Sequence, residues 1–237
     1  MAGAGGRVTM AQEASPVASP VAGDSLEGRY LVVRLRTLTG DTPVDEVLAT
    51  IEDGFMPLLP GIPGFVAYFG TADTNSRESA YAGVFDDKAG ADESTELGAT
   101  WLQDNGYDFF EGEPVVLDGT IGVAAGSLTA SGLGSGYVVI RSRTLKAGRS
   151  GSELLDLVRE GFVPLLEAVP GFVAYLAVAN EETGNQFSVG VYADEAGATE
   201  STRLAAEWGT QGAADFVEGD PIVIEGPIGL SLVGDAG

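Results

Sequence analysis

The sequence predicts an α+β protein built from two copies of one unit of about a hundred residues. Shifting the 237-residue chain by 107 positions aligns residues 30–122 with 137–229 without a gap, and 41 of the 93 aligned pairs are identical. Within each copy, segments with strand-like and helix-like patterns alternate. A Gly/Ser-rich stretch at 126–136, typical of a linker, separates the two copies.

Six elements are expected in each copy. In the first copy they are a strand at 30–38, a helix over 44–59, strands at 65–71 and 79–85, a helix at 89–103 and a strand at 114–121. The first strand is rich in β-branched and aromatic residues, and the first helix carries apolar residues at helical spacing. This order, strand-helix-strand-strand-helix-strand, is typical of the ferredoxin-like (βαββαβ) unit.

In such a unit both helices cover one face of a four-stranded antiparallel sheet, and the other face needs a cover. Two tandem ferredoxin-like repeats solve this by facing each other, which makes an α+β barrel within one chain. We therefore expect a first repeat at 29–125, the linker at 126–136 and a second repeat at 137–237. The chain would then be self-sufficient as a pseudo-dimer.

Residues 1–28 have a different composition. Small residues and two Ser-Pro steps fill this segment without apolar periodicity, which predicts a disordered leader. Thr9-Met10-Ala11 has the small-residue spacing of a signal-peptidase site, although the charged and apolar parts of a complete signal are missing. We expect an exported protein with a trimmed signal; the alternative is an ordinary cytoplasmic N-terminus.

Composition excludes several function classes. The net charge is −23, from 35 acidic and 12 basic residues, and no segment carries the basic cluster that nucleic acid or an anionic membrane would need. There is no Cys and no His, which removes disulfides, thiolate nucleophiles, Cys/His zinc sites, histidine-ligated haem and Ser-His-Asp triads. No acidic cluster has the spacing of a calcium loop. We expect no metal and no cofactor.

The candidate ligand-binding residues lie on the first strand of each copy and in a repeated PGFVAY segment. Strand alternation places Tyr30, Arg34 and Arg36 on one face, and the second copy repeats them as Tyr137, Arg141 and Arg143. The repeated segment adds Tyr68 and Tyr175. Buried arginines are rare without a partner, so these residues are expected to line a barrel cavity that holds a small hydrophobic or anionic molecule.

Structural roles are the alternatives. The four arginines could reach the barrel rim and pair with repeated acids such as Glu111 and Glu218. The two tyrosines could be ordinary strand aromatics, and Trp101 and Trp208 lie at helical spacing typical of core packing. A fully packed barrel interior would rule out both functions that place a ligand inside the barrel.

The chain resembles the antibiotic-biosynthesis-monooxygenase-like domains of the dimeric α+β barrel superfamily. The resemblance rests on PGFVAY at Pro63–Tyr68, which recurs unchanged in the second copy, and on FDDKAGADEST…W in residues 85–101, which recurs as YADEAGATEST…W in residues 192–208. It implies that one chain supplies both halves of a barrel that members usually make by dimerising.

Three functions remain open: a small-molecule-binding protein, a cofactor-independent monooxygenase acting on an aromatic or phenolic substrate, and a ligand-free structural or partner-binding duplicate. The missing histidine removes the usual general base near neutral pH. The fold alone does not distinguish among these three functions.

Overall fold

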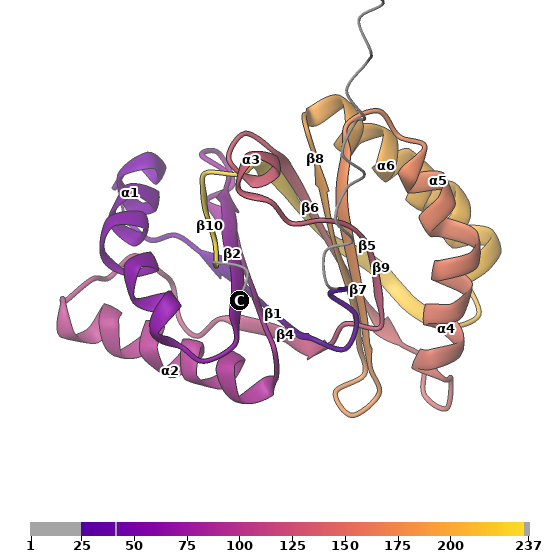
Figure 1. Cartoon of the computed structure of the whole chain (residues 1–237), viewed down its shortest axis with the longest axis horizontal. Helices are drawn as coiled ribbons and strands as arrows, with labels where there is room; N and C mark the ends of the chain where they lie inside the picture. The colour runs from indigo at the N-terminus through magenta and orange to yellow at the C-terminus, as the bar shows by residue number, and fades with distance from the viewer. Residues whose placement is uncertain (1–24, 41, 235–237) are drawn as a thin grey trace, which may run out of the picture.

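Two five-stranded antiparallel sheets pack face to face, and helices cover their outer sides (Figure 1). This computed structural model describes residues 25–40 and 42–234. The strand order is β10-β2-β3-β1-β4 in the first sheet and β5-β7-β8-β6-β9 in the second. The α+β fold with two ferredoxin-like units is confirmed.

The first half of the chain contains the six expected elements. In order, they and the segments around them are β1 (Tyr30–Thr37), α1 (Val44–Gly54), a 3₁₀ helix (Met56–Gly61), β2 (Phe65–Ala72), β3 (Glu78–Phe85), α2 (Lys88–Asp104), β4 (Val115–Thr120) and β5 (Val123–Gly126). The α-helix expected over 44–59 ends at Gly54 and continues as the 3₁₀ helix, in which Pro57 and Pro60 cannot donate backbone hydrogen bonds.

The second half repeats this order with small changes. Its elements are α3 (Ala130–Leu133), β6 (Tyr137–Leu145), α4 (Gly151–Leu157), a π-helical turn (Val158–Phe162), α5 (Val163–Glu167), β7 (Phe172–Asn180), β8 (Asn185–Tyr192), α6 (Glu195–Trp208), a second π-helical turn (Gly209–Ala213), β9 (Val217–Pro227) and β10 (Leu230–Val233). The domain boundaries themselves stay predictions.

Each sheet is completed by an edge strand from the opposite half, which the sequence did not predict. β5 leaves the first half and pairs antiparallel with β7, while β10 returns from the end of the chain and pairs with β2. Val123 and Leu230, the first residues of these strands, are related by the same shift of 107 positions. The exchange covers the edges of β2 and β7, which would otherwise present unpaired backbone groups.

The space between the sheets is a packed apolar core. From the first sheet it contains Leu31, Val33 and Phe69, and from the second Leu176 and Phe187, all of which are almost completely buried. The side chains that alternate with them point outward, toward the helices. The barrel interior is therefore filled mainly with aliphatic and phenylalanine side chains.

The predicted linker at 126–136 is more than a spacer. Thr129 caps the short helix α3 by accepting a hydrogen bond from the Gly132 N–H at 3.1 Å. Leu133, within the linker, is fully buried in the core between the sheets. The segment thus contributes packing as well as length.

The predicted leader lies mostly outside the described residues, which begin at Ser25. Its last four residues differ from the expectation of disorder. Leu26 packs against the core between the sheets, and the Glu27 carboxylate accepts a hydrogen bond from the Ala124 N–H at 3.2 Å. Within residues 25–40 and 42–234, no helix has the length and apolar character needed to cross a membrane.

Candidate functional site

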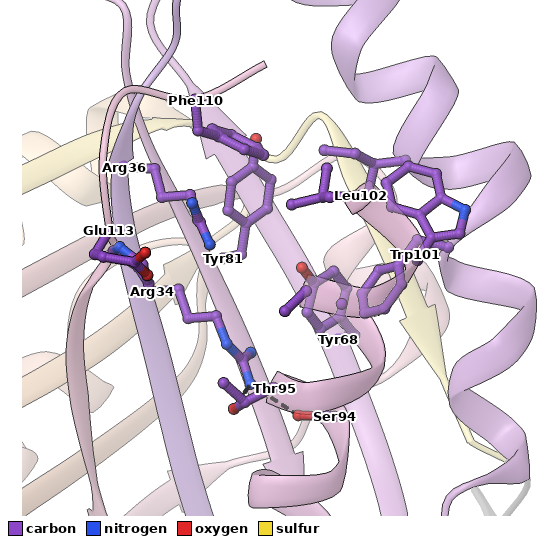
Figure 2. A pocket seen from close by; sticks show the side chains of 15 residues that line it. Arg34, Arg36, Tyr68, Tyr81, Ser94, Thr95, Trp101, Leu102, Phe110 and Glu113 are labelled. Carbon is purple, nitrogen blue, oxygen red and sulfur yellow. Dashed lines mark hydrogen bonds between the residues drawn. The ribbon is translucent and has the colours of Figure 1, made fainter. Parts of the chain in front are cut away.

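Each sheet forms a pocket with the helices that cover it, on the face opposite the packed core. The first pocket has a volume of about 120 Å³ and the second about 170 Å³. In the first, β1, β2 and β3 supply one wall, and α1 and α2 supply the other (Figure 2). Its principal side chains are Arg34, Arg36, Phe55, Tyr68, Tyr81, Ser94, Thr95, Trp101, Phe110 and Glu113.

Arg34 is the buried cation of the first pocket. Its Nη2 donates to Ser94 Oγ at 2.8 Å and to Thr95 Oγ1 at 2.5 Å, both on α2, and more weakly to the Ala91 carbonyl at 3.4 Å. All of these acceptors are neutral, and no salt bridge in the described part of the chain involves Arg34. Burial lowers its pKa, because the charged form loses its hydration.

Arg36 lies two residues further along β1 and reaches the same pocket. Its guanidinium carbon is 4.7 Å from the centre of the Phe110 ring, a cation–π contact. Burial lowers the pKa of Arg36, and the Glu113 carboxylate, which also lines the pocket, opposes that shift.

Aromatic rings form the remaining wall of the first pocket. Tyr68 and Tyr81 stack with their planes 8° apart and their centres separated by 6.4 Å, and Phe55 meets Tyr68 edge-on at 5.7 Å. Burial raises the pKa of Tyr68 well above its usual value and that of Tyr81 to about 12. The Tyr81 hydroxyl is buried and has no hydrogen-bond partner among the described residues. Both phenols are therefore neutral hydrogen-bonding groups at neutral pH.

The second pocket repeats the arginine anchor. Arg141 Nη2 donates to Ser201 Oγ at 3.1 Å and to Thr202 Oγ1 at 2.6 Å, the counterparts of Ser94 and Thr95. The other terminal nitrogen of Arg141, Nη1, is buried without a hydrogen-bond partner in the described structure. Burial lowers the pKa of Arg141 and raises that of Tyr175, which lines the same pocket, to about 12.

Six of the eight predicted site residues line these pockets. Arg34, Arg36 and Tyr68 meet in the first, and Arg141, Arg143 and Tyr175 meet in the second. Tyr30 and Tyr137 lie at the start of their strands and line neither pocket. The Tyr30 hydroxyl instead donates to Asp118 at 2.8 Å.

The predicted position of the cavity was wrong. The site was expected inside the barrel, but the arginine-bearing face of β1 points toward α1 and α2, and the interior is packed. Both faces of the strand are buried, so burial alone could not distinguish them. The predicted alternative pairs are absent as well, since no salt bridge within residues 25–40 and 42–234 joins an arginine to Glu111 or Glu218.

Sequence reasoning missed several residues of the site. Ser94 and Thr95 were recognisable, because the same pair recurs at Ser201 and Thr202. Tyr81 and Phe110 carried no such signal, since serine and valine stand at the matching positions. Trp101 was expected in the core; it packs 5.7 Å from Phe55 and also lines the pocket.

Solved structures with the same fold include several oxygenase-related proteins. A provisionally assigned monooxygenase from Fusobacterium nucleatum has a TM-score of 0.68 and 12% identity, covering 89% of this chain and 96% of its own. An anthrone oxidase-like protein has a TM-score of 0.62 and 12% identity, covering 90% of this chain and 96% of its own. A provisionally assigned monooxygenase from Lactobacillus acidophilus has a TM-score of 0.58 and 10% identity, covering 87% of this chain and 97% of its own.

No protein-family model matches the sequence, and no curated protein matches it significantly. The resemblance to monooxygenase-like α+β barrels is confirmed in the structure, at identities where likeness extends to the fold alone. The chain therefore shares the two-sheet α+β fold of these monooxygenase-like proteins.

Proposed function

We propose that this chain binds small molecules in its helix-covered pockets, and that the first pocket takes a single-ring aromatic compound bearing one anionic group. One observation carries the proposal: the Arg34 guanidinium is buried beside an aromatic wall with only neutral hydrogen-bond partners. A carboxylate or phenolate would supply the missing countercharge.

The energetics of burial support an anionic ligand. Removing a charged group from water costs several kcal/mol unless an opposite charge or strong hydrogen bonds compensate. Arg34 keeps neutral partners on one side of its guanidinium, and Arg36 adds a second cation to the same pocket. A site with two guanidinium groups is suited to bidentate recognition of a planar oxyanion.

Size and wall chemistry support a single aromatic ring. An apolar cavity of about 150 Å³ is known to hold benzene, so the first pocket, at about 120 Å³, has room for no more than one ring. The rings of Tyr68, Tyr81 and Phe110 surround this space (Figure 2). Aromatic pairs prefer stacked or edge-to-face contact, which these rings offer to a ligand ring.

The test is ligand-dependent stabilisation by 4-hydroxybenzoate, which carries one ring, one carboxylate and one phenol. At 100 times its Kd, a ligand stabilises a protein by about 2.7 kcal/mol. We expect this stabilisation in the natural chain, its loss in Arg34→Gln, and its retention in Arg203→Gln, an exposed arginine on α6. Equal stabilisation of both variants would contradict the proposed site, and no binding across a panel of aromatic acids would favour the ligand-free alternative.

Oxygenation of a bound substrate is the second candidate function, and the fold shared with monooxygenase and anthrone oxidase-like proteins favours it. In the reaction, an activated CH₂ loses a proton and its carbanion reduces O₂. One oxygen atom remains as a new carbonyl and the other leaves as water, so that R₂CH₂ and O₂ give R₂C=O and H₂O. Arg34 and Arg36 would stabilise the oxyanion form of the substrate.

Within the first pocket, the proton acceptor would be Glu113, because the raised pKa values of Tyr68 and Tyr81 keep these phenols protonated. Incubation under oxygen with single-ring compounds that carry an activated CH₂ group should consume one O₂ per carbonyl formed, and Glu113→Gln should slow this consumption. Absence of oxygen uptake across the panel would reject the enzymatic candidate and leave the binding function standing.

A further inference from the structure

We infer that the second pocket is a separate binding site with a different specificity, and that it takes a short aliphatic dicarboxylate. This inference rests on the proposed function only in treating the helix-covered pockets as binding sites. Matched positions of the two pockets have diverged in charge, in wall chemistry and in helix geometry, and the first two changes favour a more anionic and less aromatic ligand.

The first difference between the two pockets is the charge of the residues that line them. The second pocket presents Arg141 and Arg143 and no carboxylate, whereas the first pocket presents two arginines and Glu113. Asp220, the counterpart of Glu113, does not line the second pocket. Glu225 is the carboxylate that opposes the lowered pKa of Arg141, and its Oε2 accepts a weak hydrogen bond from Thr202 at 3.5 Å. Two guanidinium groups without a lining acid suit two anionic groups.

The cations themselves are freer in the second pocket. Arg141 Nη1 is buried without a partner. Arg36 in the first pocket lies over the Phe110 ring, but Val217 stands at the matching position beside Arg143. An unpaired buried donor is costly, and this cost would be recovered if the Arg141 side chain turned so that Nη1 met a ligand oxygen.

The aromatic wall is smaller in the second pocket: Phe162, Tyr175 and Trp208 remain, but a serine and a valine stand where Tyr81 and Phe110 line the first. Ser188 and Gln186 line the second pocket where Tyr81 and Ser79 stand in the first half. The neighbouring walls include Val158 and Val223. Ser188 and Gln186 can donate hydrogen bonds to additional carboxylate oxygens, and the aliphatic side chains can cover a short methylene chain.

Two π-helical turns border the second pocket. The turn at Val158–Phe162 interrupts the helical segment between α4 and α5, and the turn at Gly209–Ala213 extends α6. Both contribute lining residues, and neither has a π-helical counterpart in the first half. Such turns are frequent at functional sites, and the second pocket is the larger of the two, at about 170 Å³ against about 120 Å³.

The test uses isothermal titration of the full chain with glutarate and, separately, with 4-hydroxybenzoate. We expect one equivalent of glutarate to bind, and Arg143→Gln to weaken it by about 30-fold or more, as expected for loss of one partner of a close charge pair. The matched variant Arg36→Gln should leave glutarate affinity unchanged and weaken 4-hydroxybenzoate.

A second variant converts the specificity. Replacing Ser188→Tyr and Val217→Phe together gives the second pocket the aromatic residues of the first, so glutarate binding should be lost and the stoichiometry of 4-hydroxybenzoate should rise from one to two. Circular dichroism of this variant checks that it folds.

Several results would overturn the inference. These are two equivalents of 4-hydroxybenzoate on the natural chain, no glutarate binding, or glutarate binding that Arg143→Gln leaves intact. The first of these results would leave the proposed aromatic site standing. Conversely, glutarate binding without 4-hydroxybenzoate binding would remove the proposed function of the first pocket and retain the dicarboxylate site.

Discussion

The two faces of strand β1 have different surroundings: one meets the opposite sheet and the other meets the helices. Leu31, Val33 and Leu35 face the opposite sheet and are buried in the core between the sheets. Arg34 and Arg36 alternate with them and face the helices, where they line the first pocket. The same alternation recurs in β6, where Val138 and Ile140 enter the core and Arg141 and Arg143 line the second pocket. The packed core and the proposed binding pockets thus lie on opposite faces of the same strands.

The two faces also differ in the number of unsatisfied polar groups that they bury. The core between the sheets consists mainly of apolar side chains, with one such group, Thr71 Oγ1 on β2. On the helix-facing side, the Tyr81 hydroxyl and Arg141 Nη1 are buried without hydrogen-bond partners in the part of the chain that the structure describes. Unsatisfied buried polar atoms are uncommon in native proteins and call for an explanation. Their position in the pockets supports a binding role for that face.

The largest expected effect tests the core side of this comparison. Phe69→Ala removes a fully buried ring from between the sheets and should lower the free energy of unfolding by about 3–5 kcal/mol. Phe110→Ala, on the half-buried pocket side, should cost about 1 kcal/mol, mainly through its contact with Arg36. Denaturant unfolding of both variants measures the difference. Equal losses of unfolding free energy would mean that the two faces contribute equally to stability.

An intermediate effect is expected on stability at alkaline pH, through the buried tyrosines of the two pockets. Folding raises the pKa values of Tyr81 and Tyr175 from 10.0 to about 12. The folded state therefore binds more protons than the unfolded state between these values, so stability falls as pH rises through this window. Each tyrosine contributes about 2–3 kcal/mol that is present below about pH 10 and is lost by about pH 12.

Denaturant unfolding across this pH window, with tyrosinate absorbance recorded in parallel, measures the alkaline effect. Tyr81→Phe and Tyr175→Phe should each reduce the pH dependence. If the ionisation midpoints of these two tyrosines were near 10, the phenols would be hydrated rather than buried in the pockets.

The smallest expected effect separates a binding arginine from a structural one. Arg34→Met replaces a buried charge that has only neutral partners with an apolar side chain of similar length. The replacement removes the cost of burying an uncompensated charge but also loses the hydrogen bonds to Ser94 and Thr95, so the free energy of unfolding should change by no more than about 1 kcal/mol, while 4-hydroxybenzoate no longer stabilises the variant. A loss of 3 kcal/mol or more would show that Arg34 mainly supports the fold.

Part of the site was predictable because strand geometry is local. Period-two alternation placed Arg34 and Arg36 on one face, and the repeat marked Arg141 and Arg143 as their counterparts. Alternation does not say which face meets the helices, because both faces of a covered strand are buried. The pockets were therefore expected inside the barrel, on the wrong side of the sheet.

Residues contributed by other elements were harder to predict. Tyr81 reaches the first pocket from β3, and Phe110 reaches it from the loop before β4. Neither recurs in the second half, so the repeat gave no indication of them, and their position depends on how distant segments pack. The exchange of β5 and β10 between the sheets is also a long-range pairing that no local pattern encodes.

The sequence by itself determined the duplicated α+β unit, the order of its elements and the absence of Cys and His from any chemistry the protein performs. These properties follow from composition and from local periodicity, which are readable along the chain. Only the tertiary structure decided that the sheets meet through a filled core, that the arginines face the helices, and that the two pockets differ in charge and lining. Those outcomes depend on contacts between segments far apart in the chain, where side-chain packing selects one arrangement of faces that local patterns leave open.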